Sequence, residues 1–556
     1  KHPTANHNLG LIAVAAQKNS DALPYFKKAL EANPKIEMFW LSYIDSLIRE
    51  KKYHSASKIL NKAFKLGLMT KSLKSRKNQV DLIIGSIKKA NTTPPQKQIN
   101  TLLKYFQSGN LNGAEELSSL ITREYPGYQL AWQILGITLS QTGRTSHSLR
   151  AFQTAIKLDP QDAMAHLNYG AVLQELGKLD EAEKFLRKAL LIKSDFAEAH
   201  YNLGIVFQKK AQLEDAIKCY KDAIASKPDF SEAYYNLGNT LKSHKRHEEA
   251  EASYRKAVEI RPDFSESLFN LGNLLKELGR LEEAEKNFKK VISLKPDYAE
   301  AYFSLGEVFN DLGQISNSIK SFLKTLELDS EDNLGATLKL ASLGERKIPK
   351  KTPEGYMKEY YRIKSKNWSN NDRKQKKYNG HKIIEKAFTK IHKNSEQLDI
   401  LDLGCGTGSL ARFLRSYAKT LDGVDLSSDM LKKAKKTNLY DNLYEKDINR
   451  FLDTTKSAYD TVVAAAVLIH FFELDELFCL IRTSLRENGI FIFSVFEETK
   501  ELRGLNSSLF YTHSEDYINP IAHRLNFEII HQQRNVHEYQ KDRAVDAMVY
   551  ILKKKS

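Results

Sequence analysis

A glycine recurs every 34 residues through the middle of this chain, and this period constrains the fold more than any other feature of the sequence. Prolines recur in the same phase, and alanines and large apolar or aromatic residues hold two further places in each unit. A period of this length predicts a solenoid in which each unit is a pair of antiparallel helices. The glycines are Gly136, Gly170, Gly204, Gly238, Gly272 and Gly306, and the most regular prolines are Pro228, Pro262 and Pro296.

These positions resemble tetratricopeptide repeats. Regular units follow one another from 129 to 332, and looser units occupy 3–36, 37–70 and 95–128. We predict repeats over residues 1–70 and 95–332, with a basic linker or helix at 71–94 and a linker or capping segment at 333–352. Because the chain starts at Lys1, without methionine and inside a repeat-like unit, we expect the first repeats to be incomplete.

Asparagines stand two residues before the glycine in four successive units, on the first helix of each unit. First helices line the concave face of such solenoids, and a side-chain amide can both donate and accept hydrogen bonds. The repeats resemble those of O-linked N-acetylglucosamine transferase, in which such a ladder holds an extended peptide. We therefore predict peptide binding, with the alternative that asparagine merely suits helix packing. The four residues are Asn168, Asn202, Asn236 and Asn270.

A second constraint is the segment LDLGCGTG, residues 401–408, which predicts a strand, a tight turn and the start of a helix at 409–417. Glycine-rich turns of this kind bind either dinucleotides or S-adenosylmethionine. Asp402 would repel a pyrophosphate and suits an ammonium group. Asp425 follows the next strand, at the place from which a carboxylate binds ribose hydroxyls, and Asp447 follows a third strand. The three acids are thus predicted at one edge of an α/β sheet.

The motifs LDLGCGTG, GVDLS, KDI and YDTVVAAAVL together resemble the class I S-adenosylmethionine-dependent methyltransferases, over about 356–553. The resemblance implies a Rossmann-like, seven-stranded doubly wound domain at 353–556 that binds S-adenosylmethionine. We expect residues 351–556 to fold and bind cofactor without the repeats. Asp402 and the turn would hold the methionine portion, Asp425 the ribose, and Asp447 with Ile448 the adenine. The implied cofactor residues are Asp402, Gly404, Cys405, Gly406, Gly408, Asp425, Leu426, Met430, Asp447 and Ile448.

The chain is most similar overall to bacterial predicted methyltransferases that carry tetratricopeptide repeats. A sulfonium already activates its methyl group, so the protein must mainly align a nucleophile and exclude water. Where a base is needed, the candidates are His470, Tyr511 and His513, each of which has a structural role as its alternative. Relatives often carry an acid where this chain has Ala466, which leaves a carboxylate at the acceptor pocket in doubt.

The composition argues against several other classes. A net charge of +16 raises nucleic acid as a partner, but lysine and glutamate are interleaved along most of the chain, and a solvated surface explains the charge equally well. Three scattered cysteines indicate neither a disulfide framework nor a zinc site, so we expect no metal. No apolar run approaches the roughly 18 to 20 residues that span a bilayer, so we expect a cytoplasmic protein.

Residues 353–391 are basic and rich in tyrosine, a pattern found in RNA-binding segments and in helices that cover a cofactor pocket, and we favour the second. The sequence therefore predicts a methyltransferase whose repeats recruit a protein or peptide substrate or partner. One alternative is a methyltransferase for a small molecule, such as a quinone, lipid or glycan, with the repeats as an assembly handle. The other is a non-catalytic scaffold that binds S-adenosylmethionine.

Overall fold

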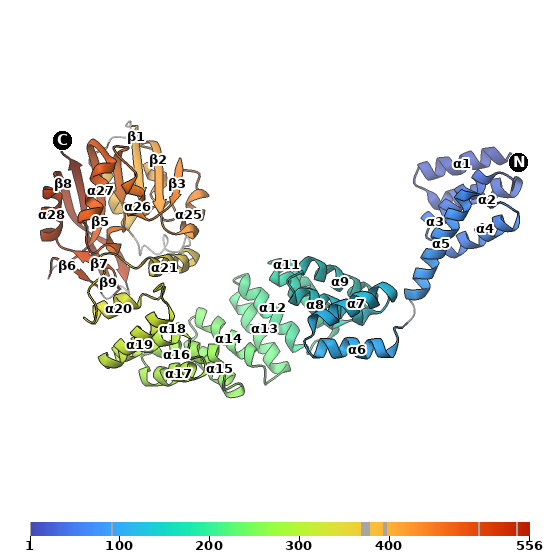
Figure 1. The fold of residues 1–556 in the computed structure, drawn as a ribbon, viewed down its shortest axis with the longest axis horizontal. Helices are drawn as coiled ribbons and strands as arrows, with labels where there is room; N and C mark the ends of the chain where they lie inside the picture. The colour runs from blue at the N-terminus through green and yellow to red at the C-terminus, as the bar shows by residue number, and fades with distance from the viewer. Residues whose placement is uncertain are drawn as a thin grey trace. The chain divides into compact units, whose positions relative to one another are not determined.

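The computed structural model describes residues 2–90, 93–367, 379–392, 397–498, 501–506, 508–540 and 543–556. The chain divides into two compact units, Lys1–Ile260 and Arg261–Ser556. The first unit is helical, and the second joins further helical repeats to an α/β domain (Figure 1). The division falls inside the predicted repeat array.

The first unit consists of helices of 12 to 20 residues joined by short turns. Helix α5 forms within the segment predicted as a basic linker or helix, and residues 91 and 92 of that segment lie outside the described residues. The helices are α1 Pro3–Ala15, α2 Asn19–Ala32, α3 Glu37–Arg49, α4 Tyr53–Lys65, α5 Lys71–Ala90, α6 Gln96–Gln107, α7 Leu111–Glu124, α8 Gln129–Gln141, α9 Thr145–Leu158, α10 Ala163–Glu175, α11 Leu179–Ile192, α12 Ala197–Lys209, α13 Leu213–Ser226, α14 Ser231–Ser243 and α15 His247–Ile260.

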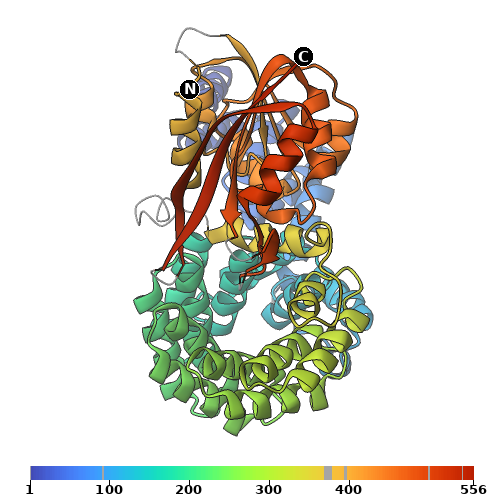
Figure 2. The ribbon, with the colours of Figure 1, turned by 90° about the vertical axis from the view of Figure 1, so that its left-hand side faces the viewer.

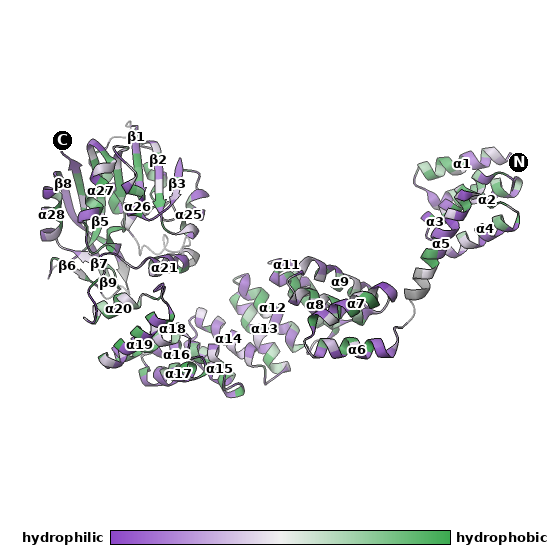
Figure 3. Cartoon of the chain, in the orientation of Figure 1, coloured by the Kyte–Doolittle hydropathy of each residue, from purple (hydrophilic) through white to green (hydrophobic). Residues whose placement is uncertain are grey.

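The periodic glycine of each regular unit packs against the periodic large residue of the same unit. A Cβ atom at Gly204 would lie 2.6 Å from Cε1 of Tyr220, and one at Gly238 would lie 2.6 Å from Cε1 of Tyr254. The two helices of a unit therefore approach more closely than any other residue would allow. Green apolar stretches alternate with purple polar ones along these helices, because each helix buries one face (Figure 3).

In the second unit, the repeats continue and lead into the α/β domain. Helix α20 and the residues after it occupy the predicted linker or capping segment. The helices are α16 Ser265–Glu277, α17 Leu281–Leu294, α18 Ala299–Asp311, α19 Ile315–Leu328, α20 Ala336–Ser342, α21 Glu354–Asn367, α23 Gly380–Phe388, α24 Ala411–Leu414, α25 Ser428–Lys435, α26 Ile448–Asp453, α27 Asp475–Ser484 and α28 Glu515–Arg524, with a 3₁₀ turn η1 at Leu468–His470.

The α/β domain has one mixed sheet in which β3, β2, β1, β4 and β5 are parallel and lie in that order. Strand β9 pairs antiparallel with β5, and β8 pairs antiparallel with β9, forming the two long dark red strands in Figure 2. The described strands are β1 Leu398–Leu403, β2 Ala418–Asp425, β3 Asn442–Glu445, β4 Tyr459–Ala464, β5 Leu485–Glu497, β6 Arg503–Leu505, β7 Tyr511–His513, β8 Phe527–Gln540 and β9 Arg543–Lys554.

All seven predicted strands are present, which confirms the Rossmann-like fold. The short strands β6 and β7 were not predicted; β7 extends the sheet from the end of β5, and β6 pairs with β7. The helix predicted at 409–417 is reduced to the four residues of α24. Within the predicted basic segment 353–391, α21 and α23 form, whereas residues 368–378, which include Trp368 and Arg373, lie outside the described residues.

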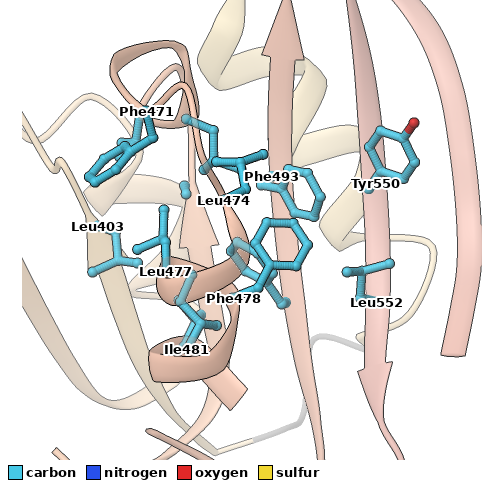
Figure 4. Packing of buried hydrophobic residues seen from close by; sticks show 14 of the residues in the cluster. Leu403, Phe471, Leu474, Leu477, Phe478, Ile481, Phe493, Tyr550 and Leu552 are labelled. Carbon is cyan, nitrogen blue, oxygen red and sulfur yellow. The ribbon is translucent and has the colours of Figure 1, made fainter. Parts of the chain in front are cut away.

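A hydrophobic core covers each face of the sheet. On one face, α26, α27 and α28 pack against the strands, and Leu477, Phe478 and Ile481 of α27 lie against Phe493 of β5 and its neighbours (Figure 4). On the other face, α23 and α24 contribute a second apolar cluster. Both faces are thus closed by helices, as a doubly wound domain requires, and polar ligands are left to the strand ends.

Candidate active site

The glycine turn after β1 has a backbone conformation that favours glycine. Gly404, Gly406 and Gly408 have φ angles of 63°, 54° and 77°. A Cβ atom at Gly404 would lie only 2.4 Å from Cγ2 of Val467, and the Cys405 amide donates to the Val424 carbonyl at 3.1 Å. The turn is therefore packed between the ends of β2 and β4, and its backbone forms one wall of a cavity.

This cavity lies at the carboxyl ends of the parallel strands and extends toward α21 and the loop after β4. It brings together nine of the ten predicted cofactor residues and one predicted catalytic residue. The exception among the cofactor residues is Gly408, which shapes the turn but does not line this cavity. The predicted residues on the wall are Asp402, Gly404, Cys405, Gly406, Asp425, Leu426, Met430, Asp447, Ile448 and His470.

The carboxylate of Asp425, at the end of β2, is oriented by hydrogen bonds from two backbone amides. Its Oδ2 accepts a hydrogen bond from the Gly406 amide at 2.9 Å, and its Oδ1 accepts one from the Ser427 amide at 2.8 Å. Burial raises the pKa of this carboxyl, and the backbone amides oppose that rise. Each carboxylate oxygen has a further lone pair, so Asp425 can still accept hydrogen bonds from a ligand.

Asp402 is 2% exposed and lies beneath the turn. Its Oδ2 accepts a hydrogen bond from the Tyr440 hydroxyl at 2.7 Å. Burial is the main cause that raises the pKa of Asp402 to about 7, and the nearby Asp425 charge adds to the effect. A cation at this end of the cavity would favour the ionised form, so this carboxyl is suited to bind an ammonium group.

Asp447 caps the N-terminus of α26 and faces the cavity. Its Oδ1 accepts from the Arg450 amide at 3.3 Å, and its Oδ2 accepts from Lys351 Nζ at 3.1 Å. Lys351 comes from the segment that follows the repeats, 96 residues earlier in the chain. Its ammonium compensates the charge of a nearly buried carboxylate.

The opposite end of the cavity is formed by aromatic and imidazole side chains. The Tyr361 hydroxyl lies 2.7 Å from Nε2 of His470, and Thr352 Oγ1 lies 3.4 Å from Nδ1 of the same ring. Burial, with a smaller contribution from Lys364, lowers the pKa of His470 to about 3, so the ring is neutral near pH 7. Phe496 and Phe510 line this end as well.

The other two predicted catalytic residues do not line the cavity. Tyr511 is buried, and its hydroxyl donates to the Pro349 carbonyl at 3.0 Å. His513 is buried and stacks on Tyr517 with ring centroids 5.5 Å apart, and burial lowers its pKa to about 4. Both side chains belong to the core around β7, so of the three predicted catalytic residues His470 is the one that lines the cavity.

Sequence reasoning missed Tyr361 and Thr352 as site residues. The tyrosines of the segment around Tyr361 were a visible signal, but their partners lie more than 100 residues away and leave no local pattern. Ala466 lines the cavity, with a φ of 58°, and its amide donates to Ser494 Oγ at 3.3 Å.

The four asparagines of the repeats differ in their surroundings. Asn202 Nδ2 donates to the Glu198 carbonyl of its own helix at 2.8 Å, and Asn236 Nδ2 donates to the Tyr201 hydroxyl at 2.9 Å. Asn168 Nδ2 is buried without a hydrogen-bond partner among the described residues. Asn270 lies on α16, in the second compact unit. Peptide binding by these amides stays a prediction.

The described residues contain no group of three or more histidine, cysteine, aspartate or glutamate side chains arranged to hold a metal ion. Cys219 and Cys405 are buried free thiols, and Cys479 is an exposed one. Across the ranges that the structure describes, no helix combines the length and apolar character needed to cross a bilayer.

Comparison with known families agrees with both parts of the chain. A family model described as a methyltransferase domain matches residues 401–493. Tetratricopeptide-repeat models match 7–64, 130–162, 161–229, 231–264, 253–286, 272–313 and 299–332.

Three curated relatives match parts of the α/β domain. A malonyl-[acyl-carrier protein] O-methyltransferase of Halalkalibacterium halodurans is 39% identical over 104 residues, which are 17% of this chain and 38% of that protein. A probable S-adenosylmethionine-dependent methyltransferase of Saccharomyces cerevisiae is 31% identical over 23% of this chain and 47% of its own length. A ubiquinone biosynthesis O-methyltransferase of Rickettsia akari is 27% identical over 22% of this chain and 50% of its own length. The chain thus spans half or less of each relative.

Among solved structures, YrrB, described as a TPR protein with an unusual peptide-binding site, is 25% identical, with a TM-score of 0.31 over 34% of this chain and 97% of its own. A MamA protein is 24% identical, with a TM-score of 0.29 over 31% of this chain and 93% of its own.

The matched family models and the geometry of the α/β domain lead to one conclusion. The chain joins tetratricopeptide repeats to a domain of the methyltransferase family.

Proposed function

We propose that this protein transfers a methyl group from S-adenosylmethionine to an acceptor bound at the His470 end of the cavity. The observation that carries the proposal is the convergence of Asp402, Asp425 and Asp447 on one cavity around the glycine turn. The donor set fits the cofactor, because a buried carboxyl suits its ammonium group and two further carboxylates can accept from ribose and adenine donors.

Each cofactor residue has a distinct role in this proposal. Asp402, with Tyr440 behind it, would bind the ammonium group, and the turn from Gly404 to Gly408 would lie against the methionine portion. Asp425 would accept from the ribose hydroxyls. Asp447 and Ile448 would bind the adenine, and Met430, buried on α25, would pack against it.

The cofactor, when bound, supplies a methyl group that its sulfonium has already activated. The chain's own residues then have to orient the acceptor and exclude water. Water is excluded by an aromatic wall, which is formed by Phe496, Phe510 and Tyr361. Because its pKa is about 3, His470 is a weak base, and because its two ring nitrogens contact Tyr361 and Thr352, it acts chiefly by holding the Tyr361 hydroxyl at this end of the cavity.

We further propose that the repeats recruit the acceptor as a protein or peptide, or recruit a partner that delivers it. Tetratricopeptide arrays offer a concave face for extended peptides. Within the first unit, Asn168 Nδ2 has no hydrogen-bond partner among the described residues, and rotation of this side chain toward the concave face would let it donate to a peptide carbonyl. Asn202 and Asn236, whose donors are bound internally, can contribute their amide oxygens.

A small-molecule acceptor is the second candidate. The names of two relatives, a malonyl-[acyl-carrier protein] and a ubiquinone biosynthesis O-methyltransferase, support an oxygen nucleophile. In that case the repeats are an assembly handle. The third candidate, a scaffold that binds the cofactor without catalysis, is distinguished from both by the absence of any methylated product.

Titration calorimetry with S-adenosylmethionine tests the cofactor assignment. We expect Asp425→Asn to weaken binding by at least about tenfold, since ribose hydroxyls would lose a charged acceptor. The matched control is Asp429→Asn, which removes an exposed carboxylate four residues further along and outside the cavity. Equal effects of the two substitutions, or tight NAD binding by the parent, would contradict the assignment.

Methyl-labelled S-adenosylmethionine added to cell lysate distinguishes the acceptors. A labelled protein band that weakens in Asn168→Ala supports recruitment by the repeats. A labelled small molecule that is unaffected by Asn168→Ala supports the second candidate. No labelled product in the presence of normal cofactor binding supports the scaffold.

A further inference from the structure

The segment that follows the repeats runs beside the site. Residues 348–353, here called the strap, are the last part of the connection between α20 and α21. Lys351 forms an isolated antiparallel bridge with Phe471, and the Phe472 amide donates to the Lys350 carbonyl at 2.7 Å. The Thr352 amide donates to the His470 carbonyl at 2.9 Å. The strap thus pairs with the loop after β4, next to the acceptor end of the cavity.

The strap is anchored on its other side as well. The Pro349 carbonyl accepts from Tyr511, and Ile348 packs in an apolar cluster whose buried members are Leu338, Leu509 and Tyr511. Leu338 belongs to α20, the last helix before the strap. Because both ends and the middle are held by packing and backbone hydrogen bonds, its side chains have defined positions.

One of these side chains contacts Asp447, which lines the cavity. Lys351 Nζ lies 3.1 Å from Oδ2 of Asp447, and the lysine side chain is 43% exposed whereas the aspartate side chain is 7% exposed. The helix cap holds one carboxylate oxygen and Lys351 holds the other, so the orientation of the carboxylate is determined at both oxygens. Without the ammonium, a nearly buried charge would lose its partner.

The neighbouring side chain contacts His470, which also lines the cavity. Thr352 is buried, and its Oγ1 lies 3.4 Å from His470 Nδ1, while the Tyr361 hydroxyl lies 2.7 Å from Nε2. When Tyr361 donates to Nε2, Nδ1 carries the proton and Thr352 accepts it. When Nε2 carries the proton instead, the same two hydroxyls exchange their roles, so the tautomer depends on which hydroxyl donates to the ring.

We propose that Lys351 and Thr352 are positioning residues, through which the end of the repeat array completes the methyltransferase site: Lys351 orients Asp447 toward the adenine amino group, and Thr352 sets the tautomer of His470. The inference rests on the proposed function, because it assigns adenine to Asp447. It also means that the site is built from both sides of the boundary between repeats and domain.

The test for Lys351 uses the full chain and S-adenosylhomocysteine, with its inosine counterpart, which has oxygen in place of the 6-amino group, as a second probe. We expect Lys351→Met to weaken binding of the adenine form by about tenfold and to reduce the preference for it over the inosine form. Lys351→Arg should retain most of the affinity for the adenine form and most of the preference for it over the inosine form. The matched control is Lys350→Met, since Lys350 is 80% exposed and pairs with Glu473 outside the cavity.

The outcomes distinguish a failure of the proposed function from a failure of the role of Lys351. Absence of S-adenosylhomocysteine binding by the parent would overturn the proposed function itself. Normal binding by the parent, with equal effects of Lys351→Met and Lys350→Met, would overturn only the role of Lys351. Thermal unfolding without ligand checks that each variant folds, and Lys351→Gln replaces the methionine variant if that one does not.

Thr352 is tested by ¹⁵N NMR of the histidine rings, with His470→Asn identifying the signal. The parent should show one tautomer, and Thr352→Val, which has nearly the same shape, should give a mixture of tautomers. Thr352→Ser should retain the parent tautomer because it keeps the hydroxyl. An unchanged tautomer in Thr352→Val would overturn the role of Thr352.

Discussion

Leu338 is the residue whose replacement best tests whether the repeat end belongs to the core of the α/β domain. It lies on α20, yet it is 0% exposed and packs with Leu509 and Tyr511, from the region of β7. Truncating a fully buried leucine to alanine costs about 2 to 5 kcal/mol. We therefore expect Leu338→Ala to destabilise the second unit by roughly 3 kcal/mol, which for a unit of 296 residues lowers the melting temperature by roughly 5 °C.

Differential scanning calorimetry of the full chain measures this effect. The transition of the α/β domain is identified as the one that S-adenosylhomocysteine shifts upward. The matched control is Leu278→Ala, because Leu278 is 44% exposed at the end of α16, in the same unit. If Leu338→Ala lowers that transition no more than Leu278→Ala does, α20 is not part of the domain core and the reasoning fails.

The same cluster bears on the expectation that residues 351–556 fold by themselves. That fragment lacks Leu338 and Ile348, and it lacks the Pro349 carbonyl to which Tyr511 donates. A fragment that begins before α20 retains all three groups. We therefore expect the fragment that begins before α20 to be more stable than residues 351–556, and thermal unfolding of the two fragments measures the difference.

Two further predictions concern the cofactor end of the cavity. Gly404→Ala should abolish S-adenosylmethionine binding in calorimetry, because its Cβ would meet Val467 at 2.4 Å, whereas Gly406→Ala, whose Cβ has no neighbour nearer than 4.0 Å, should lose much less; equal losses would contradict the packing argument. Affinity for S-adenosylmethionine should rise between pH 6 and 8, because the pKa of free Asp402 is about 7 and the cofactor's ammonium binds the ionised form. Tyr440→Phe removes a donor that favours ionisation, so this rise should move to higher pH, and calorimetry at pH 6, 7 and 8 that shows no such displacement would refute the assignment.

The features that were predicted correctly have partners close by in sequence. Gly204 meets Tyr220 within one repeat, and the turn at Gly404 to Gly408 joins a strand and helix that are adjacent in the chain. The seven main strands and the acids at their ends follow from apolar runs and from the rule that parallel strands present their carboxyl ends at one edge.

The features that were missed depend on distant partners. Strands β6 and β7 are three residues each and exist only through pairing with each other and with β5. Lys351 was one basic residue in a predicted linker, and its ion pair with Asp447 is seen only in the folded structure. Tyr511 and His513 carried the right functional groups for catalysis, but burial beside β7 directs both away from the cavity.

The sequence by itself determined the repeat architecture, the α/β domain and the place of a glycine turn and three acids at one edge of the sheet, because the period of 34 residues and the positions of residues next to strand ends depend on local geometry. Only the tertiary structure decided the other end of the cavity, where Tyr361, Thr352 and His470 meet, and the strap that joins this end to the repeats. The physical reason is that these contacts join segments about 100 residues apart, so which of many similar side chains meet is set by the packing of the whole domain.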